Sequence, residues 1–184
     1  MKLDQLEHLI RAASEITDRY EFIVVGSQSI LGSVERPPLE CLMSIEADIY
    51  PMDAEELSNL IDGAIGEGSQ FHETYGYYAQ GVDSTTAVLP HGWKTRLVRL
   101  QTPGTNERIG YCVSVLDLFM SKCAAQREKD RSFNVVLLRS GLVVLDAALA
   151  RIQDMPVDGA ARQRIEGFIR RLASDAASAG PLPR

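Results

Sequence analysis

The sequence is short of the features that mark secreted and membrane-spanning proteins. It has only three cysteines and none lie at CxxC spacing, so neither a disulfide framework nor a zinc site is indicated. No apolar run approaches the ~18 residues of a membrane span, and the charged N-terminus lacks the apolar core of a secretory signal. These shortages predict a soluble cytoplasmic protein with buried free thiols and no membrane partner.

Positive charge is also scarce. Lysine and arginine total 19 against 25 aspartates and glutamates, which gives a net charge of -6. General nucleic-acid binding requires a net basic face, so that function is not expected here. A local basic pocket for one anionic ligand is still compatible with this balance.

The chain does contain a clear change of pattern near residue 113. Before it, helical and strand-like spacings alternate, and after it every apolar repeat has helical spacing. This predicts an α/β core with a mixed sheet and flanking helices over 1–113, a C-terminal helical bundle over 114–176 and a disordered tail over 177–184. The expected strands are Glu21–Val25, Met43–Tyr50, Tyr75–Val82, Thr85–Leu89, Arg96–Gln101 and Ile109–Val113. The expected helices are 3–19, Gln28–Leu31, Asp53–Gly66, Val115–Arg127, Asp130–Arg139, Leu142–Ile152 and Gly159–Ala173.

A Gly-Ser pair stands at the first strand-to-helix turn. Gly26 would let the backbone approach a ligand closely, and free N–H groups at the start of the next helix favour a phosphate. The hydroxyls of Ser27 and Ser29 could add hydrogen bonds. The alternative interpretation is an ordinary turn in which Ser27 caps the helix.

Two acidic residues share one face of the second predicted strand. Glu46 and Asp48 are two positions apart, which places their side chains about 6.6 Å apart on the same face. Acidic residues are depleted in ordinary strands, whereas paired carboxylates suit hard divalent cations that can hold a triphosphate. The alternative is a strand whose polar face simply points to solvent.

The order of these motifs resembles the signature of the nucleotidyltransferase superfamily, hG[GS]…[DE]h[DE]h. Here it reads Val25-Gly26-Ser27, then Glu46-Ala47-Asp48-Ile49. The run SKCAAQREKD (121–130) is similar to the KxxA and REKD segments of small bacterial nucleotidyltransferase-like proteins, including those related to AbiEii toxins. The segments LPHGW (89–93) and RLV (96–98) also look like that group, so the resemblance covers roughly residues 20–135.

The resemblance implies a polymerase-beta-type α/β fold and the transfer of a nucleoside monophosphate from an NTP to an acceptor. The acceptor could be RNA, a protein or a small molecule. Gly26 and Ser27 would grip the phosphates, and Glu46 and Asp48 would bind Mg²⁺ or Mn²⁺. Lys122 would sit near the triphosphate, with Arg127, Lys129 and Asp130 lining the helical side of the cleft.

The cations of that helical segment also have a simpler interpretation. Lys122, Arg127 and Lys129 form a cationic cluster suited to an anionic ligand. They could equally form a solvated helix face on which Glu128 and Asp130 are local ion-pair partners.

Three departures from the signature bear on activity. Residues 28–45 make the gap between the motifs long, and the first acid is Glu46 rather than aspartate. The third carboxylate, which in active members lies on a neighbouring strand, has only Asp83 as a candidate, at a predicted turn. The sequence therefore leaves open a catalytically inactive nucleotide- or partner-binding protein, such as a toxin–antitoxin component, and a plain interaction module.

Overall fold

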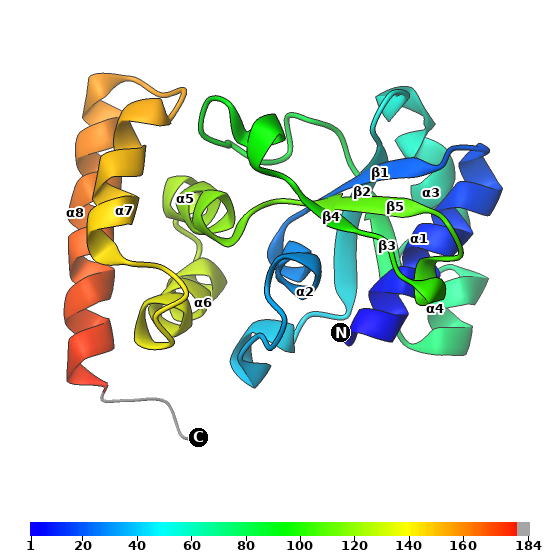
Figure 1. Cartoon of the computed structure of the whole chain (residues 1–184), viewed down its shortest axis with the longest axis horizontal. Helices are drawn as coiled ribbons and strands as arrows, with labels where there is room; N and C mark the ends of the chain where they lie inside the picture. The colour runs from blue at the N-terminus through cyan, green and yellow to red at the C-terminus, as the bar shows by residue number, and fades with distance from the viewer. Residues whose placement is uncertain (180–184) are drawn as a thin grey trace. The chain divides into compact units, whose positions relative to one another are not determined.

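The computed structural model describes residues 1–179, which form two compact units (Figure 1). Unit 1 comprises Met1–Ala87 and Arg96–Ser114, and unit 2 comprises Val88–Thr95 and the chain from Val115 onward. The second unit therefore combines the C-terminal helices with one segment from the predicted α/β part. Of the predicted tail, residues 177 and 178 belong to the last helix, and residues 180–184 lie outside the described residues.

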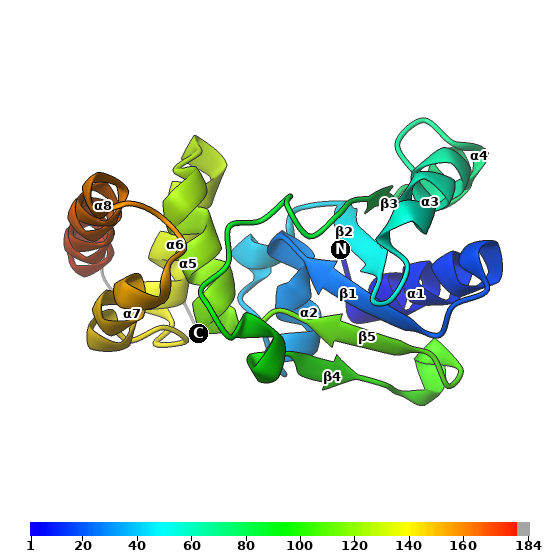
Figure 2. The same cartoon turned by 90° about the horizontal axis from the view of Figure 1, so that it is seen from above.

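Unit 1 is built on a five-stranded mixed sheet with the strand order β3-β2-β1-β5-β4 (Figure 2). The central strand β1 runs antiparallel to β2 and parallel to β5, while β2 and β3 are parallel and β4 and β5 antiparallel. The prediction of a mixed α/β fold is thereby confirmed. The strands are β1 (Glu21–Val25), β2 (Glu46–Pro51), β3 (Tyr78–Gly81), β4 (Val98–Leu100) and β5 (Ile109–Cys112).

One face of this sheet makes the hydrophobic core with helices α1 (Leu3–Thr17) and α3 (Ser58–Ile65). Side chains alternate between the two faces of a strand. Strand β2 contributes Ala47 and Ile49 to the core. The side chains that alternate with them therefore lie on the other face of the sheet. The core residues of the five strands and of these two helices are Phe22, Val24, Ala47, Ile49, Ala79, Leu100, Cys112, Leu6, Leu9, Ile10, Ala13, Ile61 and Ile65.

Several local predictions were wrong in unit 1. The strand predicted from Met43 begins only at Glu46, because the Met43 side chain is 79% exposed and belongs to no buried face. Residues 85–89 form turns and irregular chain rather than a strand. The strand predicted from Tyr75 is preceded by a short helix, α4 (Gln70–Tyr75), which starts where the Ser69 side chain accepts from the His72 N–H.

The remaining helices were all predicted, but several of them begin at a different residue. In unit 1, α2 is a single short piece (Ile30–Ser33), and α3 follows a 3₁₀ turn (Glu55–Leu57) instead of starting at Asp53. Unit 2 is helical as predicted, with α5 (Val115–Ala125), α6 (Glu128–Arg139), α7 (Leu145–Arg151) and α8 (Gly159–Ser178).

Two of the exclusions made from the sequence can be compared with the structure. Cys41, Cys112 and Cys123 are all buried thiols that form no disulfide within residues 1–179, which confirms the prediction for the thiols. Within residues 1–179, no helix combines the length and apolar character needed to cross a membrane.

Candidate functional site

The Gly-Ser turn and the second acid of β2 are in direct contact. Asp48 pairs with Val25 across the β1–β2 ladder, so its side chain lies beside the residue that follows β1. Gly26 adopts φ +63° and ψ −167°, a backbone conformation essentially restricted to glycine. A Cβ on Gly26 would overlap Oδ2 of Asp48 and lie 3.0 Å from its Cγ. Glycine is therefore the residue that allows this carboxylate to lie against the turn.

The first acid of β2 is held by the neighbouring strand. Glu46 pairs with Tyr78 in the parallel β2–β3 ladder, and the Tyr78 hydroxyl donates to Oε2 of Glu46 at 3.2 Å. Burial, together with the negative charge of Glu46, raises the pKa of Tyr78 to about 12, so the phenol keeps its proton at neutral pH. Glu46 and Asp48 are both partly exposed and lie on the face opposite Ala47 and Ile49.

The residues after Gly26 stabilise the turn. Ser29 is fully buried, and its hydroxyl donates to the Gly26 carbonyl at 2.9 Å, so a phosphate could reach it only if the turn opened. Ser27 is partly exposed at the start of the 3₁₀ turn. Gln28 is 1% exposed, and both polar atoms of its amide lack a hydrogen-bond partner. A buried amide in this state costs about 1–3 kcal/mol and often marks a functional site, and sequence reasoning did not identify it.

The neighbouring strand β3 places no acid opposite Asp48. Gln80 is the residue of β3 that lies directly opposite Asp48, and it is exposed. Asp83 lies beyond the end of β3, where its Oδ1 accepts from both the hydroxyl (2.6 Å) and the N–H (2.8 Å) of Thr85. These hydrogen bonds lower the pKa of Asp83 and make it a weak base. Among residues 1–179, no three His, Cys, Asp or Glu side chains gather closely enough to share a metal ion.

The cations predicted on the helical side lie around a buried ion pair in unit 2. Nζ of Lys122 is 2.8 Å from Oδ1 of Asp130, and the two side chains are 5% and 0% exposed. Nε of Arg127 lies 2.7 Å from Oδ2 of the same carboxylate. The ammonium also lies over the Phe133 ring, 4.4 Å from its centroid. Helix α6 begins at Glu128 rather than at the predicted Asp130, and Asp130 is a buried carboxylate in its first turn.

This arrangement bears on the nucleotide contacts predicted for these cations. The charge of Lys122 is compensated inside unit 2, which matches the interpretation in which Asp130 is a local partner, although the pair is buried rather than solvated. Arg127 keeps a largely exposed side chain, and Lys129 is exposed. Their contact with a nucleotide stays a prediction.

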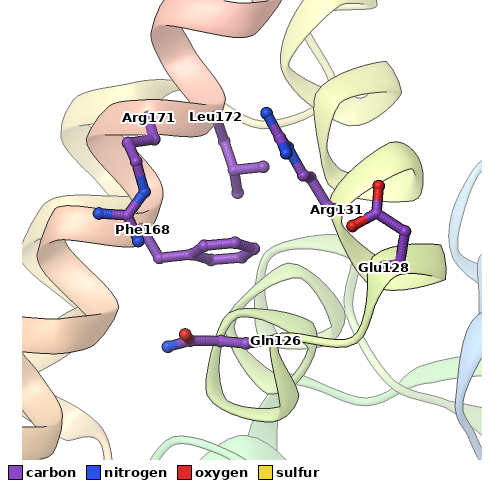
Figure 3. Close-up of a pocket in the computed structure, with 6 residues that line it drawn as sticks. All are labelled: Gln126, Glu128, Arg131, Phe168, Arg171 and Leu172. Atoms are coloured by element: carbon purple, nitrogen blue, oxygen red, sulfur yellow. The ribbon is translucent and has the colours of Figure 1, made fainter.

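Unit 2 also contains a small cavity of about 270 Å³ (Figure 3). Phe168 and Leu172 of α8 supply its apolar wall, and Gln126 and Glu128 lie at the corner between α5 and α6. Two arginines complete the lining, Arg131 and Arg171. The guanidinium of Arg131 is held by Asp175 at 2.8 Å, and that of Arg171 lies 5.8 Å from the centre of the Phe168 ring.

Of the comparisons with known proteins, the one with protein families found a match. Residues 1–164 match the model of the family described as "Nucleotidyltransferase of unknown function (DUF6036)". No curated protein and no solved structure matches the chain.

Proposed function

Because the chain belongs to this family of nucleotidyltransferases, we propose that it transfers a nucleoside monophosphate from an NTP to an acceptor with the help of Mg²⁺ or Mn²⁺. The observation that carries the proposal is the contact between Asp48 and Gly26. It brings a metal-binding type of side chain to a turn whose backbone a phosphate can approach.

The donor set of the site fits a hard divalent cation. Glu46 and Asp48 are the two carboxylates of one strand face, and both are partly exposed. Magnesium is usually bound through one or two carboxylates and substrate phosphates, so two protein ligands are sufficient for this type of site. Such an ion, when bound, neutralises charge on the phosphates.

The chain's own contribution to the reaction is positioning. An acceptor oxygen forms a new bond to the α-phosphorus, the bond from that phosphorus to the pyrophosphate oxygen breaks, and the acceptor's proton leaves to a base. Gly26 leaves the backbone free for the phosphates, and Ser27 offers a hydroxyl at the same turn. Phosphoryl-type transfer depends mainly on such positioning and on charge stabilisation, which requires few protein groups.

Incubation with α-labelled NTPs tests the proposal. We expect the wild-type protein, with Mg²⁺ or Mn²⁺ and a cell extract, to place the label on an RNA, a protein or a small molecule. Asp48→Asn keeps the side-chain size but removes the anionic ligand, so the transfer should fall by at least about 100-fold, on the scale of losing a metal ligand's contribution. Extract alone gives the background, and transfer of label by Asp48→Asn at the wild-type rate would contradict the proposal.

A second candidate function is nucleotide or partner binding without catalysis, for example in a toxin–antitoxin pair. One observation favours it: the place opposite Asp48 on β3 is taken by an amide, and Asp83 is engaged by its own turn. A protein of this kind would bind NTP with metal and give no labelled product with any acceptor. The two candidates are therefore separated by product formation and not by binding.

A further inference from the structure

Tyr78 connects Glu46 to the short helix α4. Nδ1 of His72 accepts from the N–H of Gly68 at 3.1 Å, which fixes the imidazole at the start of this helix. The ring of His72 lies against that of Tyr78, with centroids 4.7 Å apart. The Tyr78 hydroxyl then reaches Oε2 of Glu46. The carboxylate is thereby held by a chain of contacts that begins outside the sheet.

This hydrogen bond uses one acceptor site on Oε2 of Glu46 and therefore competes with a metal ion for that oxygen. Oε2 accepts a hydrogen bond from the phenol at an oxygen–oxygen distance of 3.2 Å, which is long for this type of bond, and Oε1 has no such bond. Asp48 is restrained differently, because its carboxylate lies against Gly26. Both acids are therefore fixed in the structure, and the longer glutamate is fixed by a neutral donor.

The number of oxygens that a carboxylate can offer affects which cation it prefers. Calcium takes six to eight oxygens at 2.3–2.6 Å and accepts two from one carboxylate, whereas magnesium demands a tight octahedron at about 2.0–2.1 Å. A glutamate with one oxygen already engaged is better suited to the smaller ion. The same hydrogen bond also restricts the rotamers of a side chain that would otherwise lose more entropy on binding.

We propose that Tyr78 is a positioning and specificity-determining residue, which limits Glu46 to one oxygen and so makes the acid pair favour Mg²⁺ over Ca²⁺. This inference rests on the proposed function, since it assumes that Glu46 and Asp48 hold the metal. It gives β3 a part in the site, because the β3 residue Tyr78 positions an acid of β2.

The structure supplies a matched control in the adjacent tyrosine. Tyr77 is also buried, but its hydroxyl lies 2.8 Å from Nδ1 of His8, and Tyr77 belongs to the core cluster with α1. Tyr77→Phe and Tyr78→Phe each remove one partly buried hydroxyl from the same segment. Only the second removes a group that contacts Glu46.

The experiment is a calorimetric titration of Mg²⁺ and of Ca²⁺ into each variant with a non-hydrolysable NTP analogue present. We expect Tyr78→Phe to weaken Mg²⁺ binding by about 10-fold, as loss of a ligand's supporting hydrogen bond typically does. Calcium binding should be unchanged or tighter, so the Mg²⁺:Ca²⁺ preference should fall by at least about 10-fold. Tyr77→Phe should leave both affinities as in the wild type.

The other outcomes are separable. Equal loss of Mg²⁺ and Ca²⁺ affinity in Tyr78→Phe, or no change in either, overturns the role of Tyr78. The proposed metal site still holds in that case if Glu46→Ala abolishes metal binding. Wild-type protein that binds neither ion overturns both. Circular dichroism confirms that each variant is folded, and His72→Ala gives a second test, since removal of the ring contact should lower the preference in the same direction by a smaller factor.

Discussion

Gly26→Ala is expected to lower the free energy of unfolding by about 1–3 kcal/mol and to abolish metal-dependent NTP binding. The backbone at Gly26 has φ +63° and ψ −167°, which side chains with a Cβ avoid. The new methyl group would also displace the Asp48 carboxylate, whose Oδ2 occupies that space. Urea unfolding measures the first effect, and titration with NTP and Mg²⁺ measures the second.

Gly63→Ala is the matched control for this substitution. Gly63 is an exposed residue inside α3, and a Cβ there would meet nothing within 4 Å. The change should stabilise the protein by about 0.5–1 kcal/mol, because alanine favours the helix, and leave NTP binding unaltered. If Gly26→Ala bound NTP and Mg²⁺ as well as Gly63→Ala does, the contact between Gly26 and Asp48 would have no part in the site.

Asp130→Ala is expected to destabilise unit 2 by about 3–5 kcal/mol, the range for removing one member of a buried ion pair. The substitution leaves the Lys122 ammonium buried without its anion, 4.4 Å from the centre of the Phe133 ring. Arg127 can turn to solvent, because its side chain is largely exposed, so the cost falls mainly on Lys122. Urea unfolding at neutral pH, followed by circular dichroism, measures the loss.

Two further measurements, on an exposed ion pair and on the pH dependence, test whether loss of the buried ion pair causes this destabilisation. Glu166→Ala breaks the exposed pair with Arg170 and should cost less than about 1 kcal/mol.

Burial raises the pKa of Asp130, but hydrogen bonds from Arg127 and Lys122 outweigh it and hold the pKa below its ordinary value. The ion pair therefore stabilises the fold fully above the ordinary carboxyl pKa of about 3.9 and is lost as the pH falls through the lower, folded-state value. The difference between wild type and Asp130→Ala should shrink over that acid range, and a difference independent of pH would contradict the assignment.

The sequence was most informative about secondary structure where a strong periodic pattern runs through one uninterrupted segment. The β-branched run of β1 and the acid-x-acid pattern of β2 predicted two strands, and the alternation in β2 predicted which of its side chains share a face, because alternation follows directly from strand geometry. The alternation misled at Met43, which is highly exposed, since a pattern of apolar residues does not show whether another element covers it.

The features that the sequence did not predict depend on contacts between distant segments of the chain. Helix α4 is only six residues long, and its last residue, Tyr75, is of a type that is enriched in strands. The sequence therefore favoured a strand that begins at Tyr75. The support of Glu46 by Tyr78 requires the β2–β3 register, which no local pattern specifies. Likewise, the REKD segment identified the charges around Asp130 but not its complete burial, which depends on the packing of α5 and α6.

The most direct test of the account is the thermal stability of the protein with NTP and Mg²⁺ together. If Glu46 and Asp48 bind the metal at the Gly26 turn, the melting temperature should rise with the ligands, because binding to the folded state stabilises it. Glu46→Ala and Asp48→Ala should each abolish that rise, whereas Glu56→Ala, which removes an exposed acid elsewhere in unit 1, should retain it. An equal rise in all four proteins, or none in the wild type, would show that the acid pair does not hold a metal–nucleotide complex.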